Sequence, residues 1–225
     1  MMRTAYLAAC LWLALAPGPA AAQSSAAPSG HAATPGVPPA AAPGAGPLDP
    51  APLLPVPLAD ADKARFLAFE TTRTRSVAAA LASGAADAAA LRQILAGDPQ
   101  PIRDADLAGT WRCRSAQIDD GEAAGATAGV FVYPYFRCAI TRRGGGFFLA
   151  KTNGSQRVSG TLHRVAPDRF AFLGGATVND EPQRAYGASA EGNVVAYLVK
   201  AGAGRLRLEM PQTCCSTLEI LELVR

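Results

Sequence analysis

The sequence contains very little histidine and no recognisable phosphate-binding motif. Its 225 residues include two histidines, His31 in a proline-rich stretch and His163 in a region that can fold. A single histidine in a region that can fold excludes an HExxH metalloenzyme and any metal site built from several histidines. Neither GxxxxGK[ST] nor GxGxxG occurs, so nothing marks a phosphate-binding loop.

The chain also has a small net charge and no long apolar run. Its 21 basic and 18 acidic side chains leave a net charge of +3, too small a surplus for a protein that gathers basic residues against nucleic acid. The apolar run over residues 5–16 is shorter than the roughly 20 residues that a transmembrane helix needs. We therefore expect no nucleic-acid partner and no transmembrane segment. The hydrophobic content of 49% is enough for the core of one domain.

The N-terminus has the pattern of a secretory signal peptide. Arg3 precedes the apolar run, two prolines break it, and Ala20-Ala21-Ala22 supplies the small residues of a cleavage site. We predict a signal peptide over residues 1–22, cleaved after Ala22. The protein is then periplasmic or secreted from a bacterium.

Residues 23–58 are dominated by alanine, proline, glycine and serine. They include ten prolines and one charged residue, Asp49. Such a composition cannot bury enough apolar surface to offset its conformational entropy, and its prolines favour extended conformations. We predict a disordered linker that acts as a tether.

Residues 59–98 have the pattern of a helical hairpin. Asp60 can cap a first helix over about 61–83, in which apolar residues recur at helical spacing. Gly84 supplies a stop signal between this helix and a second one over about 85–96. We expect the hairpin to pack on the structure that follows.

After Pro101 the pattern changes to short apolar segments separated by turn residues. We count eight, over about 108–118, 129–141, 146–152, 156–165, 169–176, 192–200, 204–211 and 216–224. Consecutive short strands with tight turns indicate an antiparallel meander. The fold class is mainly β (α+β with the helices), and residues 105–225 are predicted to form a small up-and-down barrel without exposed edges. The longest gap, residues 177–191, is the expected functional loop.

Four cysteines follow the predicted cleavage site, and an even number in an exported chain suggests disulfides. Reflecting the first hairpin about its loop places Cys113 nearly opposite Cys138. Cys214 and Cys215 lie in the turn before the last strand, too far from Cys113 if the first and last strands close a barrel. We therefore predict a Cys113–Cys138 disulfide. The adjacent pair can remain as thiols, form a vicinal disulfide or bind a metal, and without nearby histidine we predict no metal site.

The first predicted strand opens with Gly109-Thr110-Trp111-Arg112-Cys113-Arg114. A Gly-x-Trp at this place resembles the lipocalins, and Trp111 is then a plug at one end of the barrel. A wider set resembles an uncharacterised secreted proteobacterial family, domain-of-unknown-function family 4893, over roughly residues 59–225. That set consists of Trp111–Arg114, Phe136-Arg137-Cys138, Lys151, Gly154–Arg157 and Gly160. This resemblance brings no catalytic residues with it.

The candidate ligand-binding residues are basic or amide side chains near two hairpins. Lys151 and Arg157 flank one turn, Gln156 lies between them, and Arg112 and Arg114 lie in the first strand. Together such side chains can hold an anion or a carboxylate. The alternative interpretation is that these charges are simply exposed to solvent.

None of these features indicates an enzyme or a cofactor. The leading hypothesis is a non-catalytic binding module for a small amphipathic or anionic ligand, which requires an interior cavity. The alternative is an envelope protein-interaction or protease-inhibitor-like protein, because the chain is also similar to periplasmic barrel inhibitors of secreted metalloproteases, which open on a Gly-x-Trp strand and carry one disulfide. An interior filled by aromatic and aliphatic side chains would favour this alternative, and the relevant residues are Trp111, Phe136, Phe170, Phe172 and Leu208.

The processing prediction is tested by N-terminal sequencing of the exported protein. We expect Gln23 as the first residue. The stretch Leu7-Ala8-Ala9-Cys10 spells a bacterial lipobox, but the apolar run continues beyond it. Recovery of a lipid-modified Cys10 at the N-terminus would contradict the prediction of soluble export.

Overall fold

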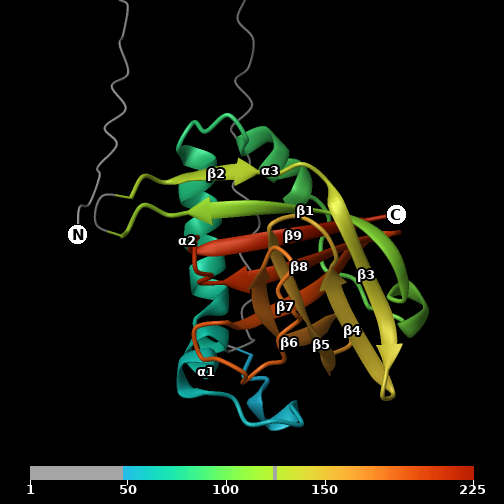
Figure 1. Ribbon diagram of the computed structural model, residues 1–225. Coiled ribbons are helices and arrows are strands. Elements are labelled where there is room, and N and C mark those ends of the chain that lie inside the picture. The colour runs from blue at the N-terminus through green and yellow to red at the C-terminus, as the bar shows by residue number, and fades with distance from the viewer. Residues whose placement is uncertain (1–47, 124–125) are drawn as a thin grey trace, which may run out of the picture. The chain divides into compact units, whose positions relative to one another are not determined.

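The computed structural model describes residues 48–123 and 126–225. Within these ranges the chain forms an antiparallel β-barrel preceded by helices (Figure 1). The predicted signal peptide and most of the predicted linker lie outside the described residues.

Eight strands close the barrel, which confirms the predicted architecture. With one additional strand, β2, the described residues contain nine: β1 (Gly109–Asp119), β2 (Gly129–Val132), β3 (Phe136–Arg143), β4 (Gly146–Lys151), β5 (Gln156–Ala166), β6 (Arg169–Val178), β7 (Asn193–Gly202), β8 (Arg205–Pro211) and β9 (Leu218–Val224). Antiparallel pairing runs from β1 through β3 and on to β9, and β9 pairs back with β1. β2 is an extra strand beside β1.

The second predicted strand is interrupted and forms both β2 and β3. β2 pairs with Ala116–Asp119 of β1, and β3 pairs with Gly109–Cys113 of the same strand. The interruption contains Pro134, whose nitrogen has no hydrogen to donate to a ladder. The barrel wall is therefore shorter on the β3–β4 side than on the β1 side.

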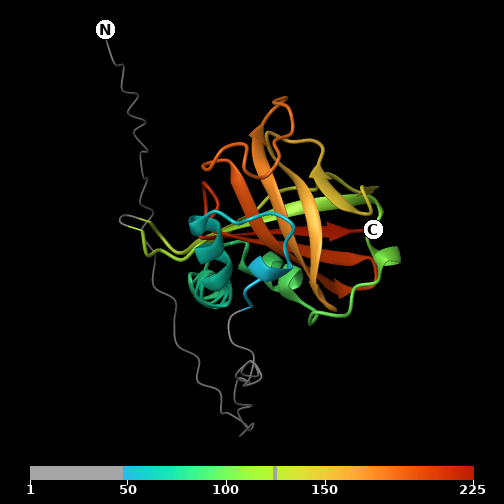
Figure 2. The same cartoon turned by 90° about the horizontal axis from the view of Figure 1, so that it is seen from below.

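The described part of the chain contains three α-helices, α1 (Asp60–Leu67), α2 (Phe69–Ala82) and α3 (Ala88–Leu95). The first predicted helix is divided at Ala68 into α1 and α2, and Phe66 and Phe69, on either side of this break, both pack on Tyr197, with ring centroids 4.9 and 4.8 Å away. α2 lies beside the barrel against β1, β8 and β9 (Figure 1), and Figure 2 shows it nearly end-on.

The end of the predicted linker packs against the barrel. Leu48, Leu54 and Leu58 contact the apolar cluster around Tyr197, whose hydroxyl donates to the Leu48 carbonyl at 3.0 Å. This packing was not predicted from the composition of residues 23–58, because three leucines change the average hydrophobicity of a long proline-rich segment very little. The described part of this segment is a packed lead-in to α1.

One half of the barrel interior is filled. Trp111 is buried there, its indole nitrogen donates to the Leu107 carbonyl at 3.0 Å, and the guanidinium of Arg225 stacks on its ring at 3.9 Å. The predicted Cys113–Cys138 disulfide is confirmed, with Cα atoms 5.9 Å apart. The same core cluster contains Phe170, Phe172 and Leu208, and the partly buried Phe136 packs against it.

Two glycines allow β5 and β6 to pack closely beneath the ring of Phe172 in the filled half of the barrel. Gly160 and Gly174 are paired across β5 and β6. A Cβ atom added to Gly160 would overlap the Leu173 carbonyl oxygen and lie 2.7 Å from Cζ of Phe172. A side chain here requires the strands to move apart.

We expect Gly160→Ala to lower the free energy of unfolding by about 1–3 kcal/mol, because it overpacks the filled half of the barrel. Gly202→Ala is the matched control, since a Cβ there meets no atom within 4 Å. Urea denaturation of both variants tests this account. Equal stability of the two variants would show that the strands tolerate a side chain at Gly160.

Candidate functional site

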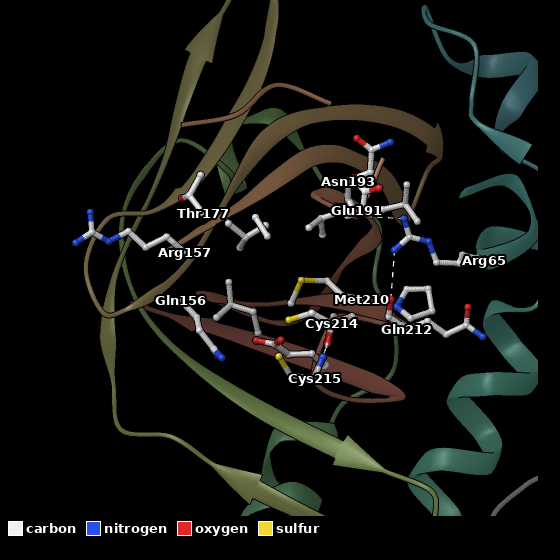
Figure 3. Close-up of a pocket in the computed structure, with 18 of the residues that line it drawn as sticks. Arg65, Gln156, Arg157, Thr177, Glu191, Asn193, Met210, Gln212, Cys214 and Cys215 are labelled. Carbon is white, nitrogen blue, oxygen red and sulfur yellow. Dashed lines mark hydrogen bonds between the residues drawn. The ribbon is translucent and has the colours of Figure 1, made fainter. Parts of the chain in front are cut away.

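The other half of the barrel interior is open. A cavity of about 430 Å³ lies between the strand ends near the β8–β9 turn (Figure 3). Its lining includes Asp62, Arg65, Ser115, Gln117, Lys151, Gln156, Arg157, Val158, Ala176, Thr177, Val178, Glu191, Asn193, Val194, Met210, Gln212, Cys214, Cys215, Glu219 and Leu221. This volume falls within the range of about 300–1,000 Å³ that is usual for small-molecule sites.

The alternation of side chains along β1 explains why this half is open. Trp111 and Cys113 point into the core, and Ser115 and Gln117 continue on the same face with smaller or polar side chains. At this end β1 pairs with β2, so it no longer faces β3 across a ladder. Gln117 Nε2 instead donates to Gln156 Oε1 at 3.0 Å. A side-chain contact thus links the walls where the backbone ladder has ended.

Lys151 is the one cation that the structure buries in this cavity without an anionic partner among the described residues. It lies at the end of β4, on the same face as the core residues Leu149 and Phe147, and is 8% exposed. Its ammonium nitrogen lies 4.3 Å from the centre of the Phe136 ring and makes no hydrogen bond or ion pair with any described residue. Burial lowers the pKa of Lys151. A buried ammonium without an acceptor is costly, and a ligand oxygen would relieve that cost.

Glu219 provides a carboxyl group in the same cavity. It lies on β9 opposite Gln117, on the core-facing side. Burial raises the pKa of Glu219, and the positive charge of Lys151 opposes this only in part. The two groups form no ion pair within 4.0 Å, so the cavity separates a cation from a carboxyl group.

A hydrogen-bonded network fixes the mouth of the cavity. The buried carboxylate of Asp62 accepts hydrogen bonds from Arg65, from the Tyr186 hydroxyl at 2.6 Å and from Asn193 Nδ2 at 2.9 Å. Arg65 also donates to the carbonyl oxygens of Asn193 and Gln212, at 3.2 and 3.3 Å (Figure 3). The network joins α1, the loop after β6, the start of β7 and the β8–β9 turn.

The ionisation of this network follows from its contacts. Burial acts to raise the pKa of Asp62, but the hydrogen bonds from Arg65, Tyr186 and Asn193 hold it below its ordinary value. Burial and the bond to Asp62 raise the pKa of Tyr186 to about 12. Asp62 is therefore a charged acceptor at neutral pH and Tyr186 a neutral donor. Tyr186 belongs to the expected functional loop, and Glu191 of that loop also lines the cavity.

The structure brings together three of the five side chains predicted to bind a ligand. Lys151, Gln156 and Arg157 line the cavity. The guanidinium of Arg157 points away from its centre (Figure 3) and donates to the Gly154 carbonyl at 2.8 Å and to Asp180 at 3.1 Å. Only Lys151 of the three thus places an unpaired charge in the cavity.

The other two predicted side chains lie on the outer face of the barrel. The guanidinium groups of Arg112 and Arg114 stack on Tyr135, at 4.4 and 4.9 Å from its ring centre. Arg114 is also paired with Glu222 at 2.7 Å. These contacts explain both arginines without a ligand.

Several cavity residues were missed by reasoning from the sequence. Glu219 was detectable, because it shares the alternation of Leu221 and Leu223 on the core face of the last strand. Asp62 and Arg65 gave no signal, because only the tertiary fold brings α1 to the mouth of the barrel. Cys214 and Cys215 line the cavity because their turn lies at the open end of the barrel, and the sequence does not show which end is open.

The chemistry available outside the cavity is limited. His163, the one histidine in the described ranges, lines a separate surface depression beside Phe170, and burial lowers its pKa. Within residues 48–123 and 126–225, no three side chains of His, Cys, Asp or Glu gather in a way that could hold a metal ion. None of the helices in those ranges is both long and apolar enough to span a membrane.

A protein-family model matches residues 56–223, which include the three helices and nearly the whole barrel. No curated protein and no solved structure matches the chain. The residues of the cavity and of the network at its mouth all lie within the matched range.

The Asp62 network generates a prediction about stability and pH. Asp62→Asn should lower the free energy of unfolding by roughly 2 kcal/mol at pH 7, because it removes charge-assisted hydrogen bonds. Since the pKa of Asp62 is lowered by folding, this stabilisation is present above the unfolded pKa of about 3.9 and is lost as the pH falls below it. Urea denaturation at pH 7 and pH 3 measures the difference.

Asp180→Asn is the matched control, because the side chain of Asp180 is 96% exposed and its surface ion pair contributes little. A loss of stability in Asp62→Asn that is equally large at both pH values would contradict the assigned charge.

Proposed function

We propose that the chain, which belongs to the domain-of-unknown-function family DUF4893, is a non-catalytic binding module for a small amphipathic molecule with an anionic group. The observation that carries the proposal is the buried, unpaired ammonium of Lys151 in an otherwise open half of the barrel. The ligand's anionic group would lie at Lys151 and its apolar part along the cavity wall.

The cavity wall supports an amphipathic ligand over a purely polar one. Its apolar surface comes from four strands, through Val158, Val194, Met210 and Leu221. These side chains are at most 8% exposed and belong to the same cluster as the filled core, so the apolar wall of the cavity is continuous with that core. A small number of polar groups in an apolar pocket is the usual arrangement of a small-molecule site, where the polar groups set orientation.

The charge distribution supports an anion over a cation at Lys151. The nearby carboxyl group of Glu219 holds its proton more strongly than an ordinary glutamate, because burial raises its pKa. As the pH falls, Glu219 becomes neutral before ordinary carboxylic acids do, while Lys151 stays charged. The positive character of the cavity therefore increases toward acidic pH, and anion binding should strengthen in the same direction.

We further propose that the protein acts in the periplasm or outside the cell. The Cys113–Cys138 disulfide is compatible with an oxidising compartment, where such bonds persist. The predicted signal peptide of residues 1–22 supports the same location. Under this proposal the linker holds the ligand-binding barrel at a distance from whatever the N-terminal part contacts.

The alternative, an envelope interaction or inhibitor protein, is the second candidate. The observation that favours it is the filled half of the barrel, where Trp111 and Phe172 pack in one core cluster. A barrel that served only as a rigid scaffold would have no need of an open half with a buried cation. We therefore place ligand binding first.

Binding of 8-anilinonaphthalene-1-sulfonate, an anion with an apolar body, tests the proposal. We expect its fluorescence to rise on binding to the cavity. Lys151→Met keeps the length of the side chain and removes its charge, and it should weaken binding at least about tenfold, since a hydrogen bond to a charged group contributes roughly 1.5–3 kcal/mol. Arg112→Gln, on the outer face, is the matched control and should leave the affinity unchanged.

Displacement of this probe separates the two parts of the proposed ligand. Decanoate should displace it far better than decanol at neutral pH, because only the carboxylate can pair with Lys151. The probe itself, whose sulfonate stays ionised, should bind more tightly toward acidic pH, because Glu219 has a raised pKa. Equal affinity of the Lys151→Met variant and the native protein would refute a role for this lysine. Equal displacement by decanoate and decanol would refute recognition of an anion.

A further inference from the structure

Three sulfur-containing side chains line the same part of the cavity. Met210 ends the core-facing row of β8, and Cys214 and Cys215 lie in the turn that follows. Figure 3 shows the sulfur atoms of all three gathered on one side of the cavity. We propose that Met210, Cys214 and Cys215 form a site for a soft monovalent metal ion of the Cu⁺ class.

The turn between β8 and β9 holds both cysteines in place. The Gln212 nitrogen donates to the Thr217 carbonyl at 2.8 Å, and the Thr213 nitrogen donates to the Ser216 carbonyl at 3.1 Å. Cys214 and Cys215 are the two residues enclosed by these hydrogen bonds. A second link joins the hydroxyl groups of Thr213 and Ser216 at 2.8 Å. The turn therefore presents adjacent thiols on a closed hairpin.

Both thiols are available for a metal ion. Cys214 and Cys215 are free and exposed, while Cys113 and Cys138 are bonded to each other in the core. Adjacent Cα atoms are about 3.8 Å apart across a trans peptide, which is below the range of about 4.4–6.8 Å in ordinary disulfides. The backbone thus disfavours a bond between neighbours and leaves two thiols on the cavity wall.

The donor set selects the kind of metal. A structural zinc site needs about four nitrogen or sulfur ligands, and the described residues offer no histidine near this turn and no third free cysteine. Thiolate and thioether sulfurs are soft ligands that favour Cu⁺, which is satisfied by a small number of sulfurs. Two thiolates and one thioether therefore fit a soft monovalent ion better than zinc or a hard cation.

Binding at this site exchanges protons for the metal without any redox step. Each S–H bond of Cys214 and Cys215 is replaced by a Cu–S bond, two protons pass to solvent, and the ion keeps its charge. Protons therefore compete with the metal for the two sulfur atoms.

The test uses the intact protein with the Cys113–Cys138 disulfide in place. Mild reduction followed by thiol titration should find two reactive thiols, because the bonded pair is buried. Cu⁺ is then supplied under nitrogen as its bicinchoninate complex, and its loss of colour reports transfer. We expect transfer of one Cu⁺ per chain. A Cys214→Ser and Cys215→Ser double variant should abolish transfer, and Met210→Leu should weaken it, because one of the three sulfur ligands is lost.

Controls separate this site from the proposed ligand-binding function. Arg112→Gln, on the outer face of the barrel, should retain full Cu⁺ transfer. The double cysteine variant should keep the urea denaturation midpoint of the native protein, which shows that it is folded. Failure of Cu⁺ transfer to a native protein that binds 8-anilinonaphthalene-1-sulfonate normally would overturn the sulfur site alone.

Two further results would also overturn the sulfur site. The first is equal Cu⁺ transfer to the native protein and the double cysteine variant. The second is a Cys214–Cys215 disulfide that mild reduction does not open. Met210→Leu with native affinity would remove the thioether from the proposed donor set.

Discussion

The pairing of β1 with β9 closes the sheet, and the rest of the structure depends on that closure. The ladder runs from Arg112 opposite Val224 to Ile118 opposite Leu218. On one face of these two strands the side chains point into the barrel. Along the strands, this face lines first the filled core and then the polar end of the cavity. The other face carries Ala116 and Ile220, which form a second core beneath α2 and α3. A single ladder therefore positions both the interior and the helices, and no edge remains between the first and last strands.

Outside the barrel, several arginines lie in networks that bind helices to strands, and this contrast makes Lys151 unusual. The buried carboxylates Glu209 and Glu222 each accept from two arginines, Arg73 and Arg207 for the first, Arg114 and Arg205 for the second. Arg205 and Arg207 also donate to carbonyl oxygens at and beyond the end of α3, which would otherwise lack partners. The arginine-rich strands are thus explained by packing of the helices. Inside the barrel, Lys151 has no such partner, and the cavity beside it is the place where a ligand can supply one.

Much of the fold could be predicted from the sequence because its signals are local. Alternation with a period of two and closely spaced turn residues predicted the barrel strands. The positions of the two cysteines on either side of the first hairpin loop predicted the Cys113–Cys138 disulfide.

The candidate site was harder to predict, because it depends on which face and which end of the barrel each side chain occupies. Lys151 shares the alternation of Leu149 and could have been placed inside, whereas the direction of Arg157 depends on Asp180, which is distant in sequence. At the open end β1 pairs with β2 instead of β3, and this change of partner could be placed only with the register of both hairpins.

The central claim is that the open half of the barrel holds a small molecule whose anionic group meets Lys151. A crystal structure of the protein, purified without denaturation from the cells that produce it, tests this most directly. The account predicts electron density for an elongated molecule in the cavity, with an oxygen within hydrogen-bond distance of the Lys151 ammonium and an apolar part along Val194 and Leu221. A cavity that holds only water, or that is closed by inward movement of Met210 and the β8–β9 turn, would contradict it.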